Sequence, residues 1–174
     1  MPDFFYGQPF SKEDFPPDTP EKQKAMGEFF SGPANTDTVS KKTLELVKEL
    51  GDHEEGKNVN KWASLGMCWG GKIVSLTAQK GTPFSAAAEV HPAMVDPEDA
   101  KGIAIPIAML ASGDEDKDAV KGFEASCSGK KHVETFGDQV HGWMAARADL
   151  EDQRVKEEYE RGYRVLLEFY HEHL

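Results

Sequence analysis

The chain has 174 residues, the usual length of one domain, with little room for a second. It carries 20 Lys and Arg against 31 Asp and Glu, a formal net charge of −11, and no basic cluster interrupts this acidity. Such a surface repels phosphate backbones and anionic membranes, so we expect neither nucleic acid nor membrane as a partner. No apolar run approaches the ~18 residues of a membrane span, and the first residues lack the pattern of a secretion signal. We therefore expect residues 1–174 to form one soluble domain.

Two cysteines, Cys68 and Cys127, are too few for a disulfide framework and are typical of a reducing compartment. This favours a cytoplasmic location. The spacing of the Cys, His and acidic residues matches no recurrent ligand signature, so we expect no metal site.

The first third of the chain predicts two helices. Residues 1–19 are rich in proline and aromatic residues but have no period, and they predict an irregular segment. Thr19-Pro20-Glu21 is a helix start, with a cap, a first-turn proline and an acidic first turn, and Gly32-Pro33 ends that helix. A second helix is expected from about Asp37 to Gly51, followed by a polar loop over 52–60.

From Lys61 onward, short apolar runs alternate with helix-like stretches. This alternation predicts βαβ units, and hence a three-layer α/β fold in which helices flank a parallel sheet. The expected strands are Trp62–Leu65, Phe84–Val90, Ile103–Ala111 and His132–Phe136. The expected helices are Gly71–Gln79, a short turn after Pro97, Asp118–Ser128 and a long final helix over Asp152–Glu172.

The sharpest motif is Leu65-Gly66-Met67-Cys68-Trp69-Gly70-Gly71, where a predicted strand meets a predicted helix. It is the nucleophile-elbow pattern Gly-x-nucleophile-x-Gly with cysteine in place of serine. Glycines two residues either side, Gly66 and Gly70, are expected because side chains there would collide in a tight, strained turn. The N–H of Trp69 is the expected oxyanion donor, and the positive end of the helix should favour the Cys68 thiolate.

A cysteine nucleophile needs a base and a group that orients the base, and the α/β-hydrolase order is nucleophile, acid, histidine. The acidic run Asp114-Glu115-Asp116 follows a predicted strand, at the sheet end where ligand chemistry gathers. We choose Asp116 over Asp114 as the orienting acid. His141 lies in the loop after the last strand and is the candidate base.

Together these pieces resemble the dienelactone hydrolase family of the α/β-hydrolase fold, and particularly its fungal branch. The matching segments span almost the whole chain: Pro2-Asp3-Phe4-Phe5, the Cys68 elbow, His91-Pro92-Ala93-Met94-Val95, Asp116, and His141-Gly142-Trp143 with Arg147.

The resemblance implies hydrolysis of small carboxylic esters or lactones, without a cofactor, through Cys68, His141 and Asp116 and a thioester intermediate. In some members an arginine after the histidine motif binds a substrate carboxylate, a role that would fall to Arg147. We also expect His91 and Trp143 among the substrate contacts.

Family members carry several further strands ahead of the Pro-Asp-Phe-Phe segment. The resemblance therefore implies that the N-terminal half of the sheet is absent here and that activity is reduced. Trp62–Leu65 would then be an exposed edge strand, which predicts a homodimer unless residues 1–19 cover it.

Two other functions stay open. A shortened chain could be a weak or inactive homologue that acts as an interaction module. Glutamine amidotransferases also combine a cysteine elbow with a His-x-Glu motif, and His132-Val133-Glu134 has that order, although it lies on a predicted strand rather than in a loop.

Overall fold

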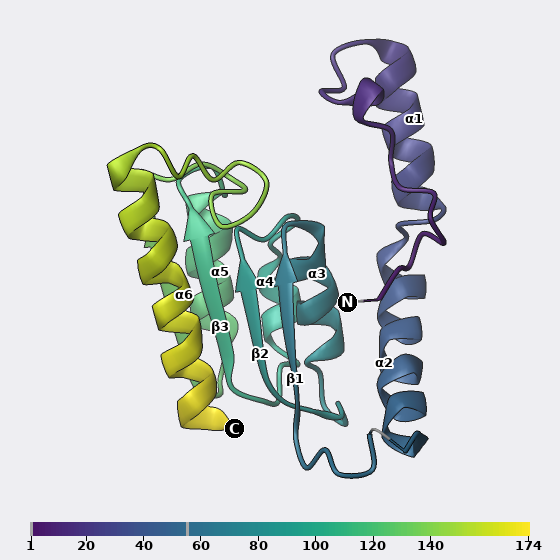
Figure 1. Cartoon of the computed structure of the whole chain (residues 1–174), viewed down its shortest axis with the longest axis vertical. Helices are drawn as coiled ribbons and strands as arrows, with labels where there is room; N and C mark the ends of the chain where they lie inside the picture. Colours follow the sequence, from purple (N-terminus) through teal and green to yellow (C-terminus); the bar gives the residue numbers. More distant parts are fainter. Residues whose placement is uncertain (1, 55) are drawn as a thin grey trace.

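The structure, a computed structural model, describes residues 2–54 and 56–174. Within these residues four parallel strands form one sheet in the order β1-β2-β3-β4 (Figure 1). The strands are β1 (Trp62–Met67), β2 (Phe84–Val90), β3 (Ile107–Ser112) and β4 (Lys131–Phe136). Each strand after β1 is reached through at least one helix, the arrangement that parallel pairing requires.

The helices cover both faces of the sheet, which confirms the three-layer α/β fold. One apolar cluster joins α3 (Trp69–Thr77), α4 (Pro97–Ala100) and α5 (Lys117–Ser126) to the sheet. The other joins the opposite face to α6 (Gln153–His173). β3 is buried along its whole length between these layers, as the continuous apolar run of a central parallel strand predicts.

The sheet register brings the carboxyl ends of the strands to one edge. Met67 of β1 pairs with Val90 of β2, and Val90 pairs with Leu110 of β3. The turns that follow β1, β2 and β3 therefore lie side by side, and the loop after β4 lies at the same edge. This edge carries the residues predicted to be functional.

Most predicted elements are present, and the errors lie at their ends. β3 begins at Ile107 rather than Ile103, because Pro106 has no N–H to pair and contributes only its carbonyl, which accepts from Ala87. The elbow helix begins at Trp69, two residues earlier than predicted. Helix α5 begins at Lys117, one residue earlier than predicted. The last shift makes Asp116 the helix cap.

The N-terminal third forms a separate arm beside the sheet (Figure 1). It contains η1 (Lys12–Asp14), α1 (Pro20–Ser31) and α2 (Thr36–Asp52). As predicted, the Thr19 hydroxyl caps α1 by accepting from the Lys22 N–H. Phe5 packs between Phe29 of α1 and Trp69 of the elbow, with ring centroids 5.1 and 5.5 Å away. The aromatic residues of the irregular segment thus fasten the arm to the elbow.

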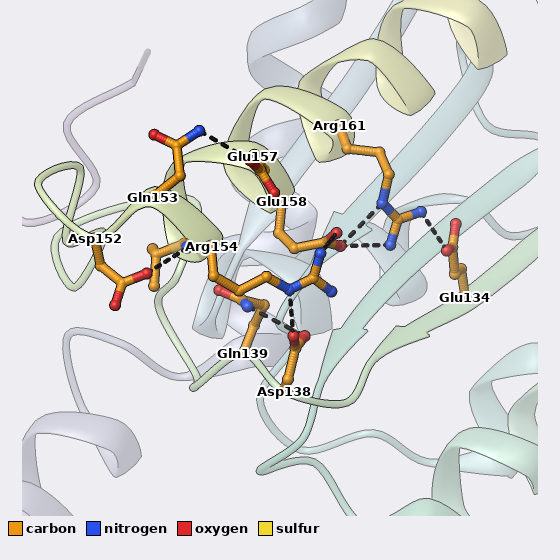
Figure 2. A network of polar contacts seen from close by, with 10 residues as sticks. Glu134, Asp138, Gln139, Asp152, Gln153, Arg154, Glu157, Glu158 and Arg161 are labelled. Atoms are coloured by element: carbon orange, nitrogen blue, oxygen red, sulfur yellow. Dashed lines mark hydrogen bonds and ion pairs between the residues drawn. The ribbon is translucent and has the colours of Figure 1, made fainter.

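An ion-pair network fastens α6 to β4 and to the loop after it (Figure 2). Glu158, only 5% exposed, accepts from Arg154 at 2.7 Å and from Arg161 at 2.6 Å. Arg161 also pairs with Glu134 of β4, and Arg154 pairs with Asp138 at 2.6 Å. Asp138 precedes His141 by three residues, so the network holds the loop that carries the candidate base.

None of the helices in the described part of the chain is long and apolar enough to cross a membrane.

Candidate active site

Cys68 lies between β1 and α3 in a strained turn. Its backbone has φ +56° and ψ −120°, in the left-handed half of conformational space that residues other than glycine seldom adopt. The side chain is exposed, whereas that of Cys127, the other cysteine, is buried. The motif therefore presents a thiol at the carboxyl edge of the sheet.

The glycines of the elbow are not equivalent. A Cβ on Gly66 would lie 2.0 Å from the carbonyl oxygen of Gly70, so this position tolerates only glycine. A Cβ on Gly70 would meet nothing within 4 Å, so the predicted collision there is wrong. The second constrained glycine is Gly71, where a Cβ would lie 2.7 Å from the Cβ of Pro92.

Cys68 meets His141, which comes from the loop after β4. A hydrogen bond with His141 lowers the pKa of the Cys68 thiol, and the charge of His141 and a hydrogen bond from the Trp69 N–H act in the same direction. Partial burial acts in the opposite direction and does not outweigh them. The same contact raises the pKa of His141 to about 10, with Glu115 as the second cause. Both directions favour a thiolate beside an imidazolium.

Glu115 holds the other side of the imidazole. The Nδ1 atom of His141 lies 2.7 Å from Oε1 of Glu115, which leaves Nε2 for the sulfur. The Glu115 side chain is 4% exposed, and its second oxygen accepts from the backbone N–H of Ser112. Burial alone would raise the pKa of Glu115, but the hydrogen bonds from His141 and Ser112 outweigh it and lower the pKa.

The prediction that Asp116 orients His141 is wrong. The Asp116 carboxylate accepts from the backbone N–H groups of Asp118 at 2.9 Å and Ala119 at 2.7 Å, so it caps α5. Capping directs Asp116 to the helix end, and the neighbouring Glu115 makes the contact with His141 instead. The sequence held a usable signal, since an Asp immediately before a helix is a typical N-cap.

Asp114, the acid that the sequence prediction passed over, holds the backbone of the His141 loop. Its carboxylate accepts from the His141 N–H at 2.8 Å. Arg147 donates to the carbonyl of His141 at 3.0 Å and lies 4.0 Å from Asp114. The side chain of Arg147 is largely exposed beside the site.

The two other predicted substrate contacts are not at the surface. Trp143 is fully buried and packs against Phe136, with ring centroids 4.4 Å apart. It is a core residue of the α6 side of the sheet, which corrects the prediction. His91 is 1% exposed and packs against the ring of His141, so its neighbour is the candidate base.

The His132-Val133-Glu134 motif lies away from Cys68. These residues belong to β4, three strands from β1 in the sheet order, and Glu134 pairs with Arg161 of α6. The amidotransferase interpretation is therefore not supported by the arrangement. Among residues 2–54 and 56–174, no group of three or more His, Cys, Asp or Glu side chains is placed to hold a metal ion.

Comparison with known proteins finds relatives by sequence and by structure. Two proteins of Schizosaccharomyces pombe, each described as an uncharacterized AIM2 family protein, C30D10.14 and C977.15, are both 34% identical to this chain. The alignments cover 98% and 99% of this chain and 69% and 70% of those proteins. A solved structure described as m3DLH matches the fold with a TM-score of 0.63 at 18% identity, covering 90% of this chain and 69% of that one.

The family pattern described as the Dienelactone hydrolase family matches residues 1–174, the full length of the sequence. This match agrees with the parallel α/β sheet of the structure. The chain therefore belongs to the dienelactone hydrolase family.

Proposed function

We propose that this chain hydrolyses small carboxylic esters or lactones, with Cys68 as nucleophile, His141 as acid and base, and Glu115 as the group that orients His141. The proposal is carried by one observation: a continuous set of contacts runs from Glu115 through His141 to an exposed Cys68 on a strained elbow. This is the arrangement of an activated nucleophile. We also propose a cytoplasmic location, where a reducing environment would keep the thiol available.

In the first half of the reaction, the Cys68 thiolate attacks the ester carbonyl carbon and the carbonyl electrons move to its oxygen. The N–H of Trp69 is the donor for that oxyanion. When the carbonyl re-forms, the bond to the leaving oxygen breaks. Protonated His141 gives its Nε2 proton to that oxygen, and a thioester with Cys68 remains.

In the second half, His141 takes a proton from water and the resulting hydroxide attacks the thioester. Collapse of this second intermediate expels the Cys68 thiolate, returning the pair to its starting charges. The sum is one water consumed and one carboxylic acid and one alcohol formed. For a lactone, both groups stay on one product molecule.

Arg147 is our proposed contact for a carboxylate on the substrate. Its guanidinium is largely exposed, while one of its nitrogens is fixed to the carbonyl of His141. An anionic group bound there would lie beside the base. Because arginine can bind a carboxylate through two parallel hydrogen bonds, this contact would also orient the substrate.

The experiment compares hydrolysis of p-nitrophenyl acetate by the wild-type chain and by Cys68→Ala, His141→Ala and Cys127→Ser. The first two substitutions should abolish turnover, whereas Cys127→Ser, at the buried cysteine, should leave it close to wild type. The Trp69 N–H is the one oxyanion donor we identify in the described residues. A site that lacks a second donor is expected to turn over roughly 10²–10³-fold more slowly.

Turnover that is indifferent to Cys68→Ala would contradict the hydrolase proposal. A folded chain with no turnover towards activated esters would favour the alternative, an interaction module built on the same fold. The exposed edge strand β1 is the feature that such a module would use.

A further inference from the structure

The segment over residues 90–93, which begins at the last residue of β2, contacts the backbone of Cys68 through both its N–H and its carbonyl. The Cys68 N–H donates to the carbonyl of Val90 at 3.1 Å. The Ala93 N–H donates to the carbonyl of Cys68 at 2.9 Å. The position of the strained cysteine is therefore fixed by this short segment as well as by its own strand and helix.

Between these two contacts lies His91, in an unfavourable backbone conformation. Its φ is +37°, and the following Pro92 restricts it further. The His91 N–H donates to the carbonyl of Leu110 at 2.8 Å, which anchors the residue to β3. Pro92 packs against α3 at the place where Gly71 has no side chain. These contacts hold His91 in a conformation that a free chain would leave.

The result is that the His91 imidazole is buried against the His141 imidazole. The ring centroids are 5.0 Å apart with planes inclined by 63°, an edge-to-face contact. The side chain is 1% exposed, and neither ring nitrogen has a hydrogen-bond partner among the described residues. Burial, followed by the charge of His141, lowers the pKa of His91 to about 4, while the charge of Glu115 acts in the opposite direction. His91 is therefore neutral at neutral pH and does not repel a protonated His141.

We propose that His91 is a positioning residue, whose ring fixes the imidazole of His141 against Cys68 while the backbone on either side of it fixes Cys68 itself. One segment thus sets the distance between the nucleophile and its base. The proposal rests on the proposed function, because it takes His141 to be the group that acts on Cys68.

The contacts predict what happens when the ring is removed. The hydrogen bond to Glu115 holds only the Nδ1 side of His141, so the ring can still turn about that contact. In His91→Ala the buried space beside His141 is open, and Nε2 can move away from the sulfur. The pKa of Cys68 should then rise toward its ordinary value, because the hydrogen bond with His141, the main cause of its lowering, is weakened.

The test measures the rate of Cys68 alkylation by iodoacetamide as a function of pH, with modified Cys68 identified by mass spectrometry. The variants are wild type, His91→Ala and His91→Phe, each in a Cys127→Ser background and each checked for folding by circular dichroism. In His91→Ala the midpoint should shift upward by about one pH unit or more. His91→Phe keeps a ring of similar shape without the nitrogens, so its midpoint should stay close to wild type.

Two results would overturn the proposal: a His91→Ala midpoint equal to wild type, or a His91→Phe midpoint shifted as far as that of His91→Ala. The second would assign the effect to the ring nitrogens rather than to ring packing. Alkylation requires no turnover, so the two proposals can fail separately. A wild-type chain with an acidic thiol sensitive to His91 but with no esterase activity would contradict the proposed function and leave the role of His91 standing.

Discussion

Three consecutive acidic residues at the end of β3 take three different partners. Asp114 accepts from the backbone of His141, Glu115 contacts its ring, and Asp116 caps α5. Sequence order and the elbow motif were sufficient to predict Cys68 and His141 and their meeting. They could not show which of the neighbouring carboxylates contacts the His141 ring. That depends on where α5 begins, because a shift of one residue in the helix start changes which acidic residue becomes the cap.

The first prediction separates these carboxylates. Glu115→Gln removes the charge that stabilises protonated His141, so Cys68-dependent ester turnover should fall by roughly 10³-fold or more, the order seen when the acid of such a triad becomes an amide. Asp116→Asn is the matched control, because Asn is as good a helix cap as Asp, and its turnover should stay within about twofold of wild type. A loss in Asp116→Asn as large as that in Glu115→Gln, measured on p-nitrophenyl acetate, would contradict the assignment.

At the scale of elements, the elbow depends on how closely β1 approaches the first turn of α3. The backbone atoms of Gly70 and Gly71 lie where a Gly66 side chain would begin. Both glycines beside the cysteine fit the sequence pattern, yet only Gly66 has this contact. The sequence pattern indicates the type of turn but not how the following helix packs against the strand. The open space around Gly70 could therefore not be predicted from it.

The second prediction concerns this approach. Gly66→Ala places a Cβ 2.0 Å from a backbone oxygen that has no room to move, and it should destabilise the fold by about 3 kcal/mol or more. Gly70→Ala adds the same methyl group in open space on a helix and should be neutral or stabilising by up to about 1 kcal/mol. Urea unfolding followed by circular dichroism measures both. Equal destabilisation of the two variants would show that the close approach does not govern the elbow.

For the whole molecule, alternating apolar runs and helix signals predicted the parallel sheet and its two helical layers, because the connecting helices of βαβ units cover the faces of a parallel sheet. The arm formed by residues 2–52 was less predictable. Its helices follow from caps and periodicity, but its attachment through Phe5 and Trp69 joins residues far apart in sequence. Phe5 and Phe10 both pack on Phe29 of α1, so these aromatic side chains of the N-terminal segment contact the arm itself.

The third prediction concerns the edge strand β1, which we propose as a homodimer interface. β1 is at the end of the strand order in the described residues, and Leu65 on it is 48% exposed. An edge strand presents backbone groups that no second strand pairs. Tyr170 of α6 donates to the carbonyl of Ser64 on β1, and Leu167 of the same helix is 70% exposed. Pairing of two β1 strands would satisfy those groups and cover Leu65. Sedimentation velocity should therefore show a dimer whose fraction rises with concentration.

Leu65→Lys should shift the population to monomer, because a charged edge strand resists pairing. Leu150→Lys, at an equally exposed leucine outside the sheet, should leave the dimer unchanged. A wild-type chain that stays monomeric at high concentration, or equal effects of the two lysines, would contradict an interface at β1.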